Sequence, residues 1–162
     1  MRLLCDEMLC GLGRWLRAAG HDTAIAQNGV GDRDLLARAV RERRTLLTRD
    51  RHLAAIAPSG VRMVLIETQE LDEQARELRK ALGLDWLFAP FTRCMMDNSV
   101  LLAAGPHHME RVPRSSRDQQ SDLRACPACG RVYWPGGHVR RMRMRLVAWH
   151  DGGMPETPPP PA

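Results

Sequence analysis

The chain has 162 residues, of which 44% are hydrophobic and 27% are charged, and its formal net charge is +5. This length allows one domain with a sizeable core and a smaller appendage. No run of about 18 apolar residues exists that could span a bilayer, and acids at positions 6 and 7 interrupt the short apolar N-terminal stretch, which excludes a secretory signal. We therefore expect a cytoplasmic protein with no membrane partner.

The positive charge is concentrated in the C-terminal part of the chain. Residues 1–90 carry a net charge of +1, whereas residues 91–162 carry +4. Nearly all of this charge comes from arginine, whose planar guanidinium suits phosphate contacts, and this favours a polyanionic partner. Five cysteines, an odd number, are better explained as thiols or metal ligands than as a disulfide framework.

The first 90 residues alternate between apolar strands and amphipathic helices. The run Leu3–Cys5 predicts a first strand that ends on Asp6, and a helix from Met8 to Ala19 then stops at Gly20. Further strands are expected at His21–Ala26, Thr45–Thr48 and Val61–Ile66, and further helices at Asp32–Arg44, Arg51–Ala57 and Leu71–Leu82. This alternation predicts an α/β fold with a parallel sheet flanked by helices.

Three acids occur at corresponding junctions of this pattern. Asp6 and Asp50 follow apolar strands, and Asp32 opens a helix. Because loops converge at the carboxyl ends of parallel strands, these acids are expected to form one carboxylate cluster that shares a metal ion. The alternative for each acid alone is that it caps a helix, which is the more frequent role for a residue placed like Asp32.

From about Phe91 the composition changes, and a small unit of this kind usually needs a metal or disulfides. Cys126 and Cys129 form a CxxC turn, which is half of a zinc site, and Cys94 and Asp97 have the same spacing upstream. His138 is the substitute ligand if Asp97 cannot reach, and a degenerate ribbon without metal is a third possibility. A redox role is disfavoured because a turn and a strand, rather than a helix, follow the CxxC motif.

Several segments, taken together, match the pattern of a known family. They are Leu4–Leu9, Gly13–Arg17, Gly20–Asp22, Asp32 with Leu35 and Leu36, Leu46–Asp50, Arg93 and Cys94 with Asn98, and Cys126–Gly136 with His138. On these residues the chain resembles the Mut-seven C-terminal RNase family, which are PIN-like nucleases with a C-terminal zinc ribbon. The one departure is Asp97, where the family pattern has cysteine.

The resemblance implies a metal-dependent ribonuclease. Asp6, Asp32 and Asp50 would gather Mg²⁺ or Mn²⁺, and RNA would be the substrate. Arg14, Arg17 and Arg49 lie near these acids in sequence and are candidates for holding substrate phosphate. The expected organisation is a PIN-like nuclease domain over residues 1–90, a zinc-ribbon-like subdomain over residues 91–142 that binds Zn²⁺ through Cys94, Asp97, Cys126 and Cys129, and a basic, then Pro-rich tail over residues 143–162.

The segment from Arg140 to Arg145 is expected to be basic and extended. The alternation of arginine with methionine and leucine up to Leu146 predicts a strand whose arginines face solvent and add sequence-independent affinity for RNA. The alternative is a charged, solvated edge that prevents aggregation. The tail from Asp151, with its run of prolines, is expected to be disordered or extended.

Other classes fit less well. A response-regulator receiver needs a lysine at a late strand end, but Lys80 falls in a predicted helix. A phosphatase of the haloacid dehalogenase type needs an Asp-x-Asp motif after the first strand, which Asp6–Met8 lacks. The main alternative is a non-catalytic RNA-binding or ribosome-associated zinc module, and metal-dependent cleavage would discriminate between the two.

Overall fold

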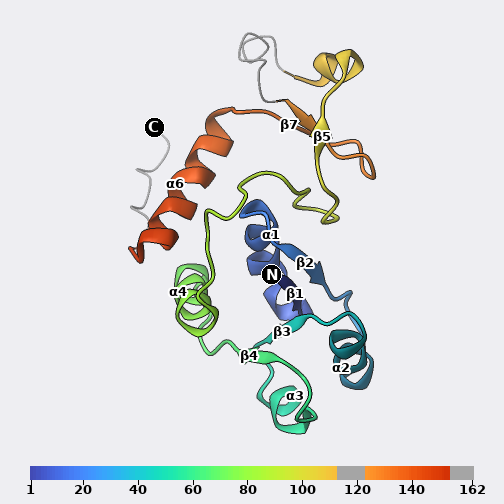
Figure 1. The fold of residues 1–162 in the computed structure, drawn as a ribbon, viewed down its shortest axis with the longest axis vertical. Helices are drawn as coiled ribbons and strands as arrows, with labels where there is room; N and C mark the ends of the chain where they lie inside the picture. Colours follow the sequence, from blue (N-terminus) through green and yellow to red (C-terminus); the bar gives the residue numbers. More distant parts are fainter. Residues whose placement is uncertain (113–122, 154–162) are drawn as a thin grey trace.

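A four-stranded parallel sheet forms the centre of the molecule (Figure 1). The computed structural model describes residues 1–112 and 123–153. The strands are β1 (Arg2–Cys5), β2 (Asp22–Ile25), β3 (Thr45–Thr48) and β4 (Met63–Leu65), in the order β2-β1-β3-β4. The predicted α/β fold with a parallel sheet is therefore confirmed, and its PIN-like character stays a prediction.

Helices cover both faces of this sheet. They are η1 (Glu7–Leu9), α1 (Cys10–Ala18), α2 (Asp32–Arg41), α3 (Arg51–Ile56) and α4 (Leu71–Leu82). Because side chains alternate along a strand, Leu3 and Cys5 of β1 pack into one apolar cluster with α1 and α4. Leu4 packs into a second cluster on the opposite face, with α2 and α3. The sheet is thus buried on both sides, as parallel sheets require.

Two predicted elements have the expected bounds, and the others shift by a few residues. β3 and α4 are as predicted, and Gly83 ends α4 with a φ of 59°, a conformation that glycine adopts without strain. The first helix begins as the 3₁₀ turn η1 before α1, the helix predicted to reach Arg44 ends at Arg41, and the fourth strand is shorter than Val61–Ile66.

A smaller antiparallel sheet follows in the C-terminal part. It consists of β5 (Leu102–Ala103), β6 (Arg124–Ala125) and β7 (Val132–Tyr133), and the turn η2 (Pro106–Arg111) lies beside it. Figure 1 shows this sheet at the end of the molecule opposite to α3. None of the helices that the structure describes is long and apolar enough to cross a membrane.

The prediction of a strand over Arg141–Leu146 is wrong, because this segment lies within helix α6 (Gly137–Asp151). Met142, Leu146 and Trp149 are buried on one side of the helix at helical spacing, and this burial outweighs the short two-residue alternation. The ring of Trp149 lies 5.0 Å from that of Trp15.

Helix α6 crosses the predicted boundary between residues 142 and 143 and joins the core cluster of the parallel sheet. The division into independently folding domains stays a prediction. Residues 154–162, most of the predicted Pro-rich tail, lie outside the described residues.

Candidate functional site

Asp6 lies directly after β1, at the carboxyl edge of the parallel sheet, and its side chain is buried. Its Oδ1 accepts a hydrogen bond from the Leu9 backbone N–H at 3.1 Å, which caps η1. Its Oδ2 accepts bonds from the Thr48 hydroxyl and from the Arg49 backbone N–H, the latter at 3.2 Å. Three donors therefore fix a buried carboxylate at the edge where α/β sheets bind ligands.

Asp50 follows β3, the strand that pairs with β1. Its Oδ1 accepts hydrogen bonds from the backbone N–H groups of His52 at 2.7 Å and Leu53 at 3.2 Å, so Asp50 caps α3. Its own backbone N–H donates to Thr48 Oγ1 at 2.9 Å. The Thr48 hydroxyl thus lies between Asp6 and Asp50 and contacts both residues.

Thr48 is a site residue that the sequence reasoning missed. It is fully buried at the end of β3, and its hydroxyl is used both as a donor and as an acceptor. The available signal was a polar residue at a strand position that had to face the interior, directly before a predicted site acid.

Asp32 is the first residue of α2 and is half-buried. Gly31 occupies the cap position and no side-chain cap bond is formed, so Asp32 does not have the capping role considered for it. In residues 1–112 and 123–153, however, Asp6, Asp32 and Asp50 do not form a group with carboxylate oxygens all within 4.8 Å of one another. Their assignment as catalytic metal ligands stays a prediction.

The three candidate arginines have different environments. Arg14 is exposed, and Arg49 is half-buried next to Asp6, with an Nε that has no hydrogen-bond partner in the described part of the chain. Arg17 is buried, and its guanidinium donates to backbone carbonyls at 2.7 to 3.0 Å. These bonds use Nε and Nη1 of the guanidinium, and the role of Arg17 in holding phosphate stays a prediction.

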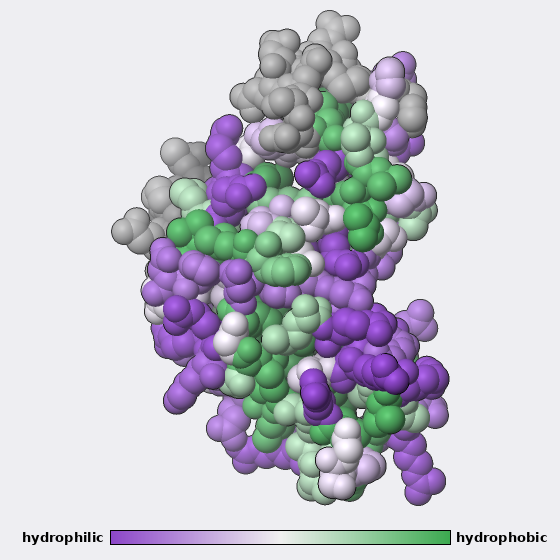
Figure 2. Space-filling model, in the orientation of Figure 1, coloured by the Kyte–Doolittle hydropathy of each residue, from purple (hydrophilic) through white to green (hydrophobic). Residues whose placement is uncertain are grey.

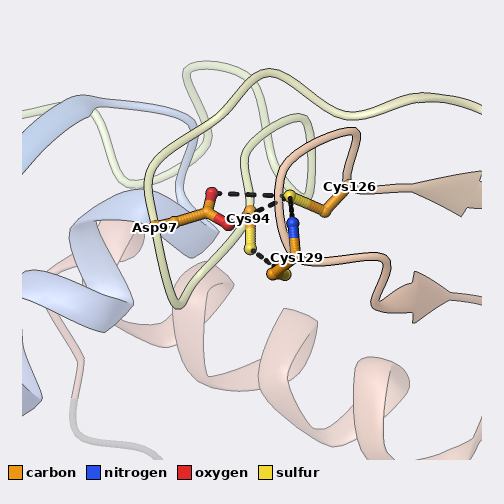
Figure 3. Close-up of side chains that lie close together, drawn as sticks. All are labelled: Cys94, Asp97, Cys126 and Cys129. Atoms are coloured by element: carbon orange, nitrogen blue, oxygen red, sulfur yellow. Dashed lines mark hydrogen bonds between the residues drawn. The ribbon is translucent and has the colours of Figure 1, made fainter.

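The predicted zinc ligands do come together. Cys94, Asp97, Cys126 and Cys129 each offer one ligand atom, and these atoms all lie within 4.8 Å of one another. Figure 3 shows Cys94 and Asp97 on one loop and the CxxC pair on a second loop that faces it. The cluster can hold a metal such as zinc. His138 lies outside this group, exposed in the first turn of α6.

The distances in the cluster suit a small tetrahedral ion. Cys94 Sγ and Cys129 Sγ are 3.6 Å apart, and Cys126 Sγ lies 3.1 Å from the nearer oxygen of Asp97. Two thiolates bound to zinc at about 2.3 Å in tetrahedral geometry are separated by about 3.8 Å. The Cys129 backbone N–H donates to Cys126 Sγ at 3.4 Å, which shapes the CxxC turn.

The ionisable groups in the cluster perturb one another. Desolvation opposes ionisation of Asp97, but hydrogen bonds from the Ser99 backbone N–H and the Cys126 thiol outweigh it and hold the pKa of Asp97 well below its usual range. The Arg131 backbone N–H favours the Cys129 thiolate, yet desolvation and the neighbouring Cys126 and Asp97 side chains raise the pKa of Cys129 to about 12. A bound dication would relieve this crowding, since metal replaces the thiol protons.

Tyr133 on β7 is a second residue that the sequence reasoning did not single out as part of a site. Its hydroxyl lies 3.3 Å from Cys94 Sγ and accepts a hydrogen bond from the Met95 backbone N–H at 3.2 Å. These contacts fix the first cysteine loop against the strand that follows the second one. The other two cysteines, Cys5 and Cys10, lie outside the cluster.

Comparison with known proteins agrees with the resemblance noted in the sequence. A family model described as the Mut7-C RNAse domain matches residues 1–146 of the 162 residues. No curated protein and no solved structure gave a significant match. The family description suggests a ribonuclease-like function, with RNA as the substrate. Since the match covers the parallel sheet, the cysteine cluster and most of α6, the chain belongs to the Mut7-C RNAse domain family.

Proposed function

We propose that this protein is a metal-dependent ribonuclease that hydrolyses RNA phosphodiester bonds at the carboxyl edge of its parallel sheet. The observation that carries the proposal is Asp6, a buried carboxylate that three donors fix at that edge, with Asp50 linked to it through Thr48. Asp32 would contribute from the first turn of α2. The family description supports the same reaction class.

The carboxylates have free acceptor capacity for Mg²⁺ or Mn²⁺. An ionised carboxylate offers about four acceptor positions, and Asp6 uses three of them. For Asp50, both hydrogen bonds from α3 go to Oδ1, which leaves Oδ2 available. Since Mg²⁺ keeps several waters and needs only one or two direct carboxylates, the three acids need not touch one another to share an ion.

Each residue has a distinct part in the reaction that we propose. A bound dication would polarise the scissile phosphate and activate water for in-line attack. The Thr48 hydroxyl and the Arg49 backbone N–H fix the Asp6 carboxylate, which would hold the ion. The Arg49 guanidinium, whose buried Nε lacks a partner in the described chain, and the exposed Arg14 would hold substrate phosphate.

We propose that zinc occupies the second cluster in a structural role. Cys94, Asp97, Cys126 and Cys129 supply four ligands, which is the full tetrahedral set, so no position remains for a reacting water. Sulfur donors favour zinc over Mg²⁺, whereas the all-oxygen acids of the sheet edge favour Mg²⁺ or Mn²⁺. The two metal centres would therefore differ in both identity and task.

The test compares two acid-to-amide variants with a matched control. Asp6→Asn and Asp50→Asn are expected to keep the fold but to lower the Mg²⁺- or Mn²⁺-dependent cleavage of single-stranded RNA by more than about 100-fold, since even the partners of metal ligands are worth about 10- to 100-fold. Asp34→Asn, an exposed acid on α2, should cleave like the wild type. EDTA should stop the reaction.

Equal turnover by all of these proteins would refute the nuclease assignment. RNA binding without metal-dependent cleavage would instead favour the non-catalytic RNA-binding module.

A further inference from the structure

At Thr23, side chains from elsewhere in the chain bond the backbone at the outer edge of the parallel sheet. β2 is an outer strand of the sheet, so one of its sides has no neighbouring strand. On that side the Thr23 backbone N–H donates to Asn98 Oδ1 at 3.0 Å, and the Thr23 carbonyl accepts from Arg17 Nε at 2.8 Å. These two side chains take the place of the ladder that another strand would form.

The same side chains hold the loop that carries two of the metal ligands. Arg17 Nη1 donates to the carbonyls of Met95 at 3.0 Å and Met96 at 2.7 Å, the two residues between Cys94 and Asp97. Asn98 follows Asp97 directly, and its Nδ2 donates to Asp22 Oδ1 at 2.7 Å. The loop is therefore attached to β2 at two places. Arg17 joins its middle, Met95 and Met96, to Thr23, and Asn98 bonds β2 directly.

Arg93 completes this attachment on the other side of the loop. Its Nη1 donates to the Asn98 carbonyl at 3.0 Å, and its Nε donates to the Gly20 carbonyl at 3.3 Å. Asn98 itself has a φ of 74°, a conformation that reverses the chain after Asp97. These contacts define the path of the backbone between Arg93 and Asn98, and with it the directions in which the ligand side chains leave the loop.

We propose that Arg17 and Asn98 are positioning residues for the metal cluster, and that they couple metal binding to the outer strand of the sheet. The inference rests on the zinc centre proposed above. Fixing the loop before metal arrives places the Cys94 thiol and the Asp97 carboxylate near their bound positions, which reduces the ordering cost of binding. By linkage, a metal that favours the docked loop must in turn stabilise the docking at Thr23.

The first test uses Asn98→Gly in the full-length chain. Glycine adopts a positive φ readily, so the backbone turn is kept while both amide hydrogen bonds are removed. Zinc affinity, measured by competition with a chromogenic chelator, should fall by about 10-fold, the lower end of the effect of partners that orient metal ligands. Asn28→Gly makes the same substitution at an exposed position and should bind zinc like the wild type.

A parallel pair tests Arg17 in the same assay. Arg17→Met removes the bonds to the loop carbonyls and should weaken zinc binding, whereas Arg14→Met, at an exposed position on the same helix, should leave zinc affinity unchanged. Wild-type zinc affinity in Asn98→Gly would overturn the inference. Wild-type protein that binds no zinc at all would overturn the proposed zinc centre instead, so the two failures are distinguishable.

The second test needs no change to the loop. Hydrogen exchange at the Thr23 amide, which donates to Asn98, should slow by about 10-fold when zinc is added to metal-free wild type, since opening of the loop then competes with metal binding. Cys129→Ser, which lacks one ligand, should show no such response to zinc. If Arg17 and Asn98 only protect the edge of the sheet, hydrogen exchange at the Thr23 amide should be the same with and without zinc. That result would also overturn the inference.

Discussion

At the scale of single residues, Thr48 connects the two acids that follow the central strands. A hydroxyl can donate once and accept twice, and Thr48 uses both abilities, toward Asp6 and toward the backbone N–H of Asp50. Because Thr48 is fully buried, water cannot replace either bond. The Thr48 hydroxyl therefore links the two acids directly, in addition to the bond from the Arg49 backbone N–H to Asp6.

Thr48→Val should damage both the fold and the reaction. Valine retains the branched shape but lacks the hydroxyl, so Asp6 loses a donor and the Asp50 N–H is left without its acceptor. We expect a loss of about 1 to 3 kcal/mol in the free energy of unfolding, typical of a buried group left unsatisfied, together with a loss of RNA cleavage of about 10-fold or more. Urea unfolding and a cleavage assay measure the two effects.

Thr45→Val, at the half-buried start of β3, is the matched control and should keep wild-type cleavage. If Thr48→Val cleaved RNA at the wild-type rate, the hydroxyl would not orient Asp6 for the reaction.

Asp22 gives the molecule a specific sensitivity to acid. Its carboxylate accepts hydrogen bonds from Arg44 at 2.9 Å and from Asn98 at 2.7 Å. Burial opposes its ionisation, but these bonds outweigh burial and lower the pKa of Asp22 from 3.8 to about 2. Because the folded-state pKa lies below the unfolded value, this contribution to stability is fully present above about pH 4 and is lost as the pH falls toward 2.

The shift corresponds to at most about 2.5 kcal/mol, since one pKa unit is worth about 1.4 kcal/mol. Asp22→Asn should therefore be less stable than the wild type at pH 5, and the difference should shrink by about 1 to 2 kcal/mol at pH 2.5 in urea unfolding. Asp34→Asn should have the stability of the wild type at both pH values. An Asp22→Asn difference that is constant with pH would mean that the carboxylate has no such role.

At the scale of elements, the four arginines of α6 lie in two different environments. Arg145 donates to Asp72 at 2.7 Å and lies over the rings of Trp15 and Trp149. Arg140, Arg141 and Arg143 are exposed on the helix. Figure 2 shows hydrophilic and hydrophobic surface side by side over α6. Three arginines of the helix are therefore exposed, although the guanidinium of Arg143 also lies 5.4 Å from the centre of the Phe91 ring, and Arg145 belongs to the packing between α6 and α4.

Replacing the three exposed arginines with glutamine should weaken RNA binding through its electrostatic part. Each phosphate contact on a single strand contributes a slope of about −0.7 in log affinity against log salt, so the slope should flatten by up to about 2. Binding to single-stranded RNA across a salt series measures it.

Arg145→Gln should leave that slope unchanged and lower thermal stability instead, because it breaks the contact with Asp72. A triple variant with the wild-type slope would mean that the exposed arginines are only a solvated face.

The sequence predicted the elements whose signals are local. β3 is a short apolar run bounded by polar residues, and the end of α4 is marked by Gly83, so both could be read without tertiary information. The α6 segment contains two periodicities, and the burial of Met142, Leu146 and Trp149 against distant parts of the chain favours the helix. Arg17 was predicted to bind phosphate because it lies near Asp6 in sequence. The loop at Met95 and Met96 that occupies it is distant in sequence.

At the scale of the whole molecule, the cysteine and aspartate cluster joins the loop that is attached to β2 with the turn between β6 and β7. We expect about one zinc per chain by elemental analysis, because the four ligands complete one tetrahedral site. Cys126→Ser should release that zinc and destabilise residues 92–140 more than the N-terminal sheet, since structural zinc supplies folding energy. Limited proteolysis resolves the two regions.

Cys10→Ser changes a half-buried thiol outside the cluster and should retain zinc. Zinc-free protein with undiminished protease resistance in residues 92–140 would show that the cluster folds without metal.

The packing of Trp149 against Trp15 and Trp86 also has a consequence for biosynthesis. Chains emerge from the ribosome N-terminus first, at about 5 to 20 residues per second. The strands of the parallel sheet are therefore translated well before the helix that completes one of its two apolar clusters. Until α6 emerges, the nascent chain leaves the Trp15 and Trp86 surface that Trp149 will cover without its partner. A chain that ends before residue 137 would therefore lack the helix that covers this surface, and its exposed tryptophans would make it prone to aggregation.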